Sequence, residues 1–377
     1  MHRLQDKPDQ AGAQPTEAMT GSGARPIFTT RGKPTGGLQE LASGLQQGLE
    51  QSDYRFIPDA VEPRLVLNYI TPDNPTPFRR RAQATFVLSV MELPEVPSQP
   101  TRSLYPYLVR ALSNMLLVYT PGHGVHFVTL ELGHYVEAEG NEFIERLVQR
   151  IDPIASSVLV INNTFEPDLE KELHDGDDLT EALKGAGKRL ADWDLLPAPF
   201  PIDEILTERD LRHVKRLYGI GGLSYGNLSA RKDAKRFWMS ASGVDKSRLD
   251  TIGRDILMVK DYDAESNAMR LSVPENVEPR RVSVDAIEHW MIYREHPEVG
   301  AIIHVHAWMD GVPSTEFNYP CGTYQLGEAV AEKVRQADDP SRAVIGLKNH
   351  GLTITGRDME DIFTRIEGRL LSSIPMT

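Results

Sequence analysis

The chain has 377 residues, a formal net charge of −13, 40% hydrophobic residues and a single cysteine. This length allows two domains, and the negative charge argues against nucleic acid or an anionic membrane as the main partner. No apolar run is long enough for a membrane span, and residues 1–6 carry no signal-peptide pattern. Cys321 has no partner for a disulfide, so we expect a cytoplasmic protein whose metal ligands, if any, are histidine and carboxylate.

The first half of the chain predicts a tail followed by a mixed domain. Residues 1–50 are rich in Gly, Gln, Pro, Ser and Thr, which indicates a mostly disordered tail, within which residues 38–49 could form a short helix. Strand and helix patterns alternate over residues 51–195 and predict a mixed α/β domain of unknown role. Three prolines predict an extended linker over residues 196–202, which leaves residues 203–377 as a second domain.

Two histidines of the first domain, His126 and His134, lie at even spacing within one strand pattern. Side chains at even spacing on a strand share a face, so the two rings could meet. No partner motif accompanies them, and we therefore favour a structural role over metal binding.

Residues 301–307 carry the strongest chemical signal in the chain. Three apolar residues lead into His304 and His306, which the i, i+2 spacing of a strand aims at one point. Neutral imidazole is a common zinc ligand. The alternative is that one histidine is buried for structural reasons and the other is exposed.

Two further segments supply possible partners for this pair. Residues 343–352 repeat the pattern of an apolar strand that ends in a histidine, His350. Residues 283–290 predict a helix with Ser283 as N-cap and Asp285 in its first turn. Together these residues suffice for a metal site of three histidines, with or without the aspartate.

Small residues characterise two strand-like segments before this region. Residues 221–231 begin as a Gly-rich turn, and residues 236–244 end in a small polar turn. Such turns let a substrate approach the backbone and leave N–H and hydroxyl donors for an anion. An ordinary hairpin with tight turns explains the same pattern equally well.

Four motifs now stand in order: residues 226–231 (GNLSAR), 240–244 (SASGV), 304–307 (HVHA) and 349–352 (NHGL). With them the chain from about residue 202 onwards resembles the class II aldolase/adducin family, which includes sugar-phosphate aldolases and 4-epimerases. The resemblance implies an α/β fold with a three-layer domain, in which a central antiparallel sheet is flanked by helices. It also implies a homo-oligomer, usually a tetramer. Residues 1–200 have no part in it.

The resemblance implies roles for individual residues. His304, His306 and His350 would bind a divalent metal, typically zinc. Asp285 occupies the position of a carboxylate that is the acid/base in the aldolases and a metal ligand in the 4-epimerases, so either role is implied here. His289 would support the metal ligands from outside the coordination sphere.

Four other positions match residues that hold the phosphate or polar end of a substrate in the family: Asn227, Ser242, Gly243 and Ser283. The expected function is a zinc-dependent aldolase-like lyase that cleaves or forms a C–C bond in a small hydroxy-carbonyl compound, of the sugar or sugar-phosphate kind, through an enediolate. The alternatives are an adducin-like assembly module, or a 4-epimerase or decarboxylase on the same metal site.

Overall fold

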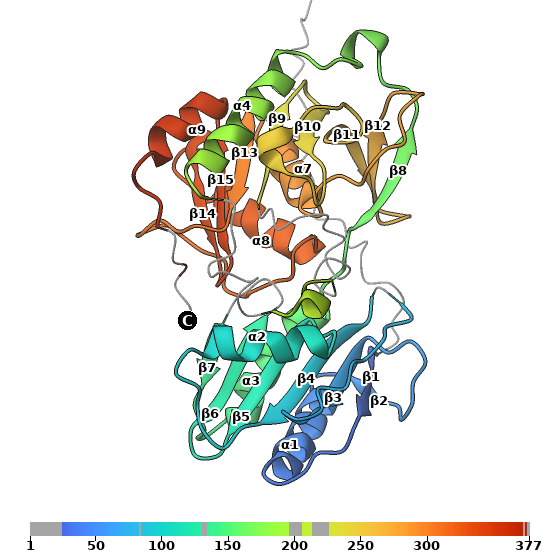
Figure 1. Cartoon of the computed structure of the whole chain (residues 1–377), viewed down its shortest axis with the longest axis vertical. Helices are drawn as coiled ribbons and strands as arrows, with labels where there is room; N and C mark the ends of the chain where they lie inside the picture. Colours follow the sequence, from blue (N-terminus) through green and yellow to red (C-terminus); the bar gives the residue numbers. More distant parts are fainter. Residues whose placement is uncertain are drawn as a thin grey trace, which may run out of the picture.

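A computed structural model describes residues 25–82, 84–129, 134–195, 206–212, 226–371 and 374. Within these residues the chain forms a seven-stranded and an eight-stranded β-sheet, each covered by helices (Figure 1). The predicted mixed α/β class is confirmed. None of the described helices combines the length and the apolar character needed to cross a bilayer.

The first sheet has the strand order β2-β1-β3-β4-β5-β6-β7. Its strands are β1 (Ile27–Arg31), β2 (Arg55–Phe56), β3 (Leu65–Tyr69), β4 (Phe86–Glu92), β5 (Met115–Thr120), β6 (Gly124–Thr129) and β7 (His134–Glu137). The strands from β2 to β5 are parallel, and β5, β6 and β7 are antiparallel neighbours. Helices α1 (Leu38–Gln51) and α3 (Phe143–Ala155) bury one face, and α2 (Pro100–Arg110) buries the other.

The structure differs from the expected disorder at residues 27–31, which form a strand, while helix α1 agrees with the short helix considered for residues 38–49. Strand β1 pairs with β2 and β3, and α1 buries Leu38, Leu41, Leu45 and Leu49 against the sheet. These leucines follow a three- and four-residue spacing, so one helix face is apolar even though the overall composition is polar. Residues 1–24 lie outside the described part of the chain.

The second sheet has the order β14-β15-β13-β9-β10-β11-β12-β8. Its strands are β8 (Asn162–Glu166), β9 (Asn227–Arg231), β10 (Phe237–Ser240), β11 (Ile256–Asp263), β12 (Ala268–Ser272), β13 (Ala301–Val305), β14 (Val344–Leu347) and β15 (Gly351–Gly356). Neighbouring strands are antiparallel apart from the parallel pair β12 and β8.

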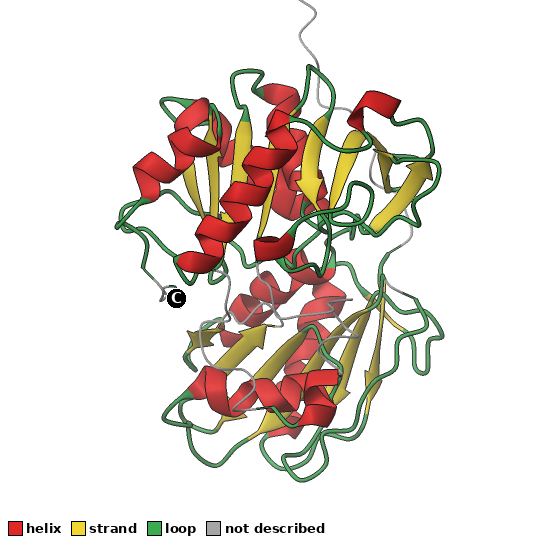
Figure 2. Ribbon diagram, turned by 45° about the horizontal axis from the view of Figure 1, so that its top comes forward, coloured by secondary structure: helices red, strands yellow, loops and turns green. Residues whose placement is uncertain are grey.

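Helices lie on both faces of this second sheet, as the resemblance implies (Figures 1 and 2). Helices α4 (Asp178–Asp192) and α9 (Met359–Ile366) pack together over β9, β13 and β15. Helices α7 (Ala286–Glu295) and α8 (Tyr324–Arg335) pack against each other on the opposite side. The described residues also include the short 3-10 helices η1 (Lys171–Leu173), η2 (Lys246–Arg248) and η3 (Pro340–Arg342).

Two elements assigned above to the first domain belong to the second sheet. Strand β8 pairs with β12, and α4 packs on β9 and β10. Both contacts join residues far apart in the chain, which local sequence patterns do not reveal. The predicted linker at residues 196–202 lies outside the described residues. The division into two domains stays a prediction.

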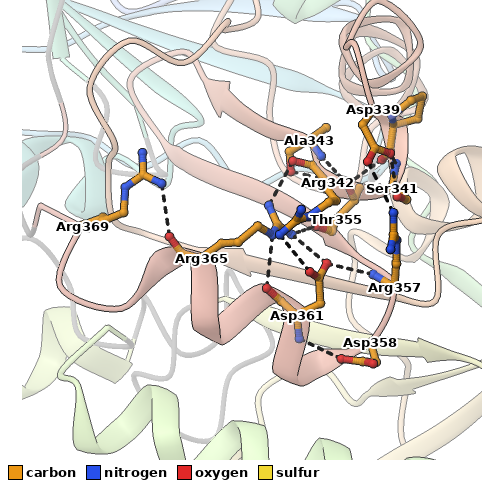
Figure 3. Close-up of polar contacts among 11 residues, drawn as sticks. Asp339, Ser341, Arg342, Ala343, Thr355, Arg357, Asp358, Asp361, Arg365 and Arg369 are labelled. Atoms are coloured by element: carbon orange, nitrogen blue, oxygen red, sulfur yellow. Dashed lines mark hydrogen bonds and ion pairs between the residues drawn. The ribbon is translucent and has the colours of Figure 1, made fainter.

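A polar network fixes α9 to the end of β15 (Figure 3). The Arg365 guanidinium donates to the backbone oxygens of Thr355 and Arg342, and it also pairs with Asp361, 3.5 Å away. The Asp361 carboxylate lies 3.2 Å from Arg342 as well. Asp358 caps the helix, because its carboxylate accepts from the Asp361 N–H. The outer end of β15 is therefore held by charged contacts, while its other end begins beside His350.

The two sheets meet near that inner end. The Asn349 side chain, in the turn between β14 and β15, donates to the backbone oxygen of His134 over 3.2 Å. Asn349 has a left-handed backbone, with φ at +55°, a conformation that asparagine tolerates better than most residues. This contact places the edge strand β7 of the first sheet beside the turn that carries His350.

Candidate metal centre

The structure brings His304, His306 and His350 together in one buried cluster. Each offers a ring nitrogen, and these atoms all lie within 4.8 Å of one another. The Nε2 atoms of His306 and His350 are 3.0 Å apart, and the three ring centroids are separated by 4.7 to 5.2 Å. His304 on β13 and His306, just after the end of β13, therefore both face the third ring, as the i, i+2 spacing predicts.

The tautomer of His304 follows from its hydrogen bond. Its Nδ1 lies 3.0 Å from the backbone oxygen of Leu352, which can only accept, so Nδ1 carries the hydrogen. The Nε2 atom then presents its lone pair to the cluster. It is buried and has no hydrogen-bond partner among the described residues. A backbone acceptor behind a histidine ring is the usual device for orienting a metal ligand.

Burial keeps the cluster neutral. It lowers the pKa of His304, and it lowers the pKa of His306 and His350 well below the usual histidine value. The charges of neighbouring rings lower the pKa of His306 and His350 further, whereas the charge of Asp285 acts the other way on His304. Neutral imidazoles are the form that binds metal, so the lone pairs remain available below the pH at which an exposed histidine is protonated.

Glycines let the strand ends converge on the cluster. A Cβ at Gly351 would lie 2.3 Å from the backbone oxygen of Val305, and a Cβ at Gly226 would lie 2.4 Å from that of His304. Gly226 also has a φ of +91°, which disfavours any other residue. These two positions explain why the GNLSAR and NHGL motifs place a glycine next to the site.

Asp285 lies next to this cluster but outside the compact histidine set. Its Oδ2 accepts from the Asn227 side chain over 2.8 Å, and its Oδ1 accepts from the Gly322 N–H over 3.1 Å. It stands at the N-cap of α7, not in the first turn with Ser283 as cap as the sequence suggests, because the helix begins at Ala286. The carboxylate is thus held in place by two donors.

The small-residue turns lie side by side. Ala241 and Val282 form an antiparallel bridge, the Ser242 N–H donates to Arg281, and the Ser283 N–H donates to Ser240. The predicted substrate residues Ser242, Gly243 and Ser283 are therefore adjacent, and Asn227 is joined to Asp285. Gly243 has a φ of +68°, as a tight turn requires. Residues 213–225, which include the start of the Gly-rich turn, lie outside the described chain.

His289 is fully buried beside the site. Its Nδ1 lies 2.7 Å from the Ser229 hydroxyl, which in turn lies 2.9 Å from the Tyr293 hydroxyl. Burial, with the charge of His304 as a second cause, lowers the pKa of His289 to about 3. His289 thus belongs to a buried network that supports β9 and α7, and it is not one of the three clustered rings.

Two ionisable residues escaped the sequence-based reasoning. Lys246 in η2 is 3% exposed, and burial lowers its pKa to about 8 against the opposing effects of Asp285 and Asp245. Glu288 on α7 is 1% exposed and accepts from the Thr353 hydroxyl over 2.5 Å. Burial, then the charge of Asp285, raises the pKa of Glu288 to about 8. Glu288 follows Asp285 by three residues, so helix spacing was the available signal.

The donor set fits a divalent cation. Three neutral imidazoles fixed on buried strands and turns are the ligand set of a catalytic zinc site that keeps further positions open. Nitrogen atoms bound to one tetrahedral zinc would lie about 3.3 Å apart, close to the observed His306–His350 separation of 3.0 Å. Among the described residues, the buried Nε2 of His304 has no hydrogen-bond partner, and a bound cation would accept its lone pair.

Comparison with known proteins points to the same region. The family model described as "Class II Aldolase and Adducin N-terminal domain" matches residues 212–314, which include His304 and His306. A methylthioribulose-1-phosphate dehydratase of Cronobacter sakazakii is 27% identical over 176 residues, which cover 38% of this chain and 82% of the relative. A 3-oxo-tetronate 4-phosphate decarboxylase of Haemophilus influenzae is 26% identical over 179 residues, covering 42% of this chain and 78% of the relative.

A third relative shows a higher identity. The methylthioribulose-1-phosphate dehydratase of Sodalis glossinidius is 34% identical over 172 residues, which cover 38% of this chain and 80% of the relative. The match therefore spans most of a complete relative, while more than half of this chain has no counterpart in it. On the strength of this match, the family model and the four ordered motifs, the chain belongs to the class II aldolase and adducin family.

Proposed function

We propose that this chain is a zinc-dependent lyase that acts on a small phosphorylated hydroxy-carbonyl compound. The observation that carries the proposal is the buried set of three neutral imidazoles, in which Nε2 of His304 has no hydrogen-bond partner among the described residues. His304, His306 and His350 would hold the cation. When bound, it would supply a Lewis acid for the carbonyl and hydroxyl oxygens of the substrate.

The role we assign to Asp285 is that of acid/base. Its carboxylate is buried, lies next to the cluster, and is oriented by Asn227 and the Gly322 N–H. A carboxylate fixed in this way can take a proton from a carbon next to a carbonyl, or return one, without reorganising first. Lys246 is buried close enough to Asp285 for the charge of Asp285 to oppose the lowering of the Lys246 pKa.

The paired turns of Ser242, Gly243 and Ser283 would hold the phosphate. They bring two hydroxyl groups together beside a tight glycine turn, and hydroxyl groups can donate to a phosphate oxygen. The relatives support this assignment, because their names specify phosphorylated substrates.

The relatives also bear on the bond that is broken. Aldol cleavage, dehydration and decarboxylation all place an electron pair next to a carbonyl group, which a cation on the carbonyl oxygen stabilises. The dehydratases among the relatives make loss of water the second candidate beside C–C cleavage. Both outcomes use the same histidines and the same proton-transfer residue.

Turnover by metal-loaded and chelator-treated protein tests the proposal. The substrates are a panel of ketose phosphates, and the assays detect aldehyde release, loss of water and carbon dioxide separately. We expect turnover only with metal, and a loss of about 10²- to 10⁴-fold in Asp285→Asn. Asp250→Asn is the control, since Asp250 is exposed. A metal-loaded wild-type protein without turnover on any member of the panel would instead support a binding module of the adducin kind.

A further inference from the structure

Cys321 stands at the edge of the histidine cluster. Its Sγ lies 3.4 Å from Nε2 of His350, the same atom that faces Nε2 of His306 at 3.0 Å. Ligands of one tetrahedral zinc would be separated by about 3.6 Å for a sulfur and a nitrogen. The observed separation is therefore the one expected for two ligands of a common cation.

The residues around Cys321 hold its backbone in place. The next residue, Gly322, donates its N–H to Asp285 and has a φ of +72°. The preceding residue, Pro320, accepts from the Thr323 hydroxyl, and Thr323 caps α8. The thiol is thus presented to His350 by a turn that is anchored on both sides.

Asp285 is less well placed to be the fourth ligand. Both of its oxygens already accept hydrogen bonds, from Asn227 and from Gly322. The cluster meanwhile contains the buried His304 Nε2, which has no partner among the described residues and so marks where a cation belongs.

We propose that Cys321 supplies a thiolate ligand to the cation held by the three histidines. This inference rests on the proposed metal site and deepens it. In the structure the sulfur contacts the cluster at His350, and the compact ligand set consists of the three histidines, so the side chain would turn towards the cation on binding. The S–H bond breaks, its proton goes to solvent, and the electron pair stays on sulfur for the metal.

A thiolate ligand from Cys321 would separate metal binding from proton transfer in the site. It lowers the net charge of the centre and leaves Asp285 free to act on the substrate.

Zinc K-edge X-ray absorption of the zinc-loaded full chain tests the inference without an activity assay. We expect a sulfur shell at about 2.3 Å beside nitrogen at about 2.0–2.1 Å in the wild type. In Cys321→Ser the sulfur shell is lost while about one zinc per chain remains on the histidines. Substitution with cobalt gives a second readout, because only the wild type should show a thiolate-to-cobalt charge-transfer band.

The outcomes separate this inference from the proposed function. Bound zinc with nitrogen and oxygen ligands alone in the wild type overturns the thiolate ligand and leaves the three-histidine site intact. A sulfur shell that persists in Cys321→Ser also overturns it, because the sulfur then comes from a methionine. A wild-type chain that retains no zinc overturns the metal site itself.

Discussion

Two groups of histidines in this chain look alike at first sight. In the first sheet Nδ1 of His126 lies 2.9 Å from Nε2 of His134, and the rings are stacked with centroids 5.2 Å apart. In the second sheet the closest nitrogens, those of His306 and His350, are 3.0 Å apart. A short distance between two ring nitrogens therefore does not identify a metal site.

The difference lies in what remains unsatisfied. One hydrogen bond explains the first pair, because one ring donates and the other accepts. The group of three cannot be resolved in this way: the Nδ1 of His304 is committed to the backbone, and its Nε2 faces two further rings without a hydrogen. Buried nitrogen lone pairs that receive no hydrogen bond indicate a cation site. A histidine pair whose hydrogen bond satisfies both rings indicates a structural role.

The largest expected effect is on zinc binding, which should depend on the three clustered histidines and not on the His126–His134 pair. His304→Ala should lower zinc affinity by more than about 100-fold, because it removes a direct ligand, and His126→Ala should leave zinc content unchanged. Elemental analysis after dialysis, followed by competition with a chelator, measures both. Equal retention of zinc in the two variants would show that the comparison is wrong.

A second experiment uses the opposite signs of the pH effects in the two regions. The pKa of Glu288 is raised from 4.5 to about 8, so the folded chain holds a proton that the unfolded chain has lost over this range. Stability of the metal-free protein should fall as pH rises through the window, by up to about 1.4 kcal/mol per pH unit. Urea unfolding should show that Glu288→Gln, which cannot ionise, lacks this fall. Parallel curves for the two proteins would contradict the assignment.

The smallest effect concerns the first pair. Burial, then the charge of His126, lowers the pKa of His134 from 6.5 to about 4. The unfolded chain therefore binds the extra proton in this window, and stability is lost as pH falls from 6.5 towards 4. His134→Asn should reduce this loss by less than about 1 kcal/mol, because the ring is partly exposed and solvent screens it. Thermal unfolding at both ends of the window measures the difference, with wild type as reference.

The sequence was informative where one element sets the geometry. Strand alternation predicts that His304 and His306 point the same way, and the apolar run before His350 predicts a third ring delivered by a second strand. The three rings meet because the apolar run forms β14, His350 lies in the turn from β14 to β15, and β15 is the neighbour of β13 in the sheet. Sequence patterns can therefore predict a site whose residues lie on one strand and on the segments directly beside it.

Other features depend on closure of the whole fold. The even spacing of His126 and His134 predicts that both lie on one strand. In the structure they lie on the neighbouring strands β6 and β7, and their rings meet because Val128 pairs with His134. Lys246 and Cys321 reach the site from a 3-10 turn and a loop, and no local periodicity marks either. The resemblance to the family supplied the candidate roles of Asn227 and the small-residue turns, which residue patterns alone left open.

One hydrogen bond described above ties the two halves of the molecule together at a sensitive place. Asn349 is the immediate neighbour of His350. Its side-chain amide donates a hydrogen bond to the backbone oxygen of His134 in β7, the edge strand of the first sheet. A displacement of that strand would therefore act on the residue next to His350. The first sheet is in this way joined directly to the turn that carries one ring of the histidine cluster.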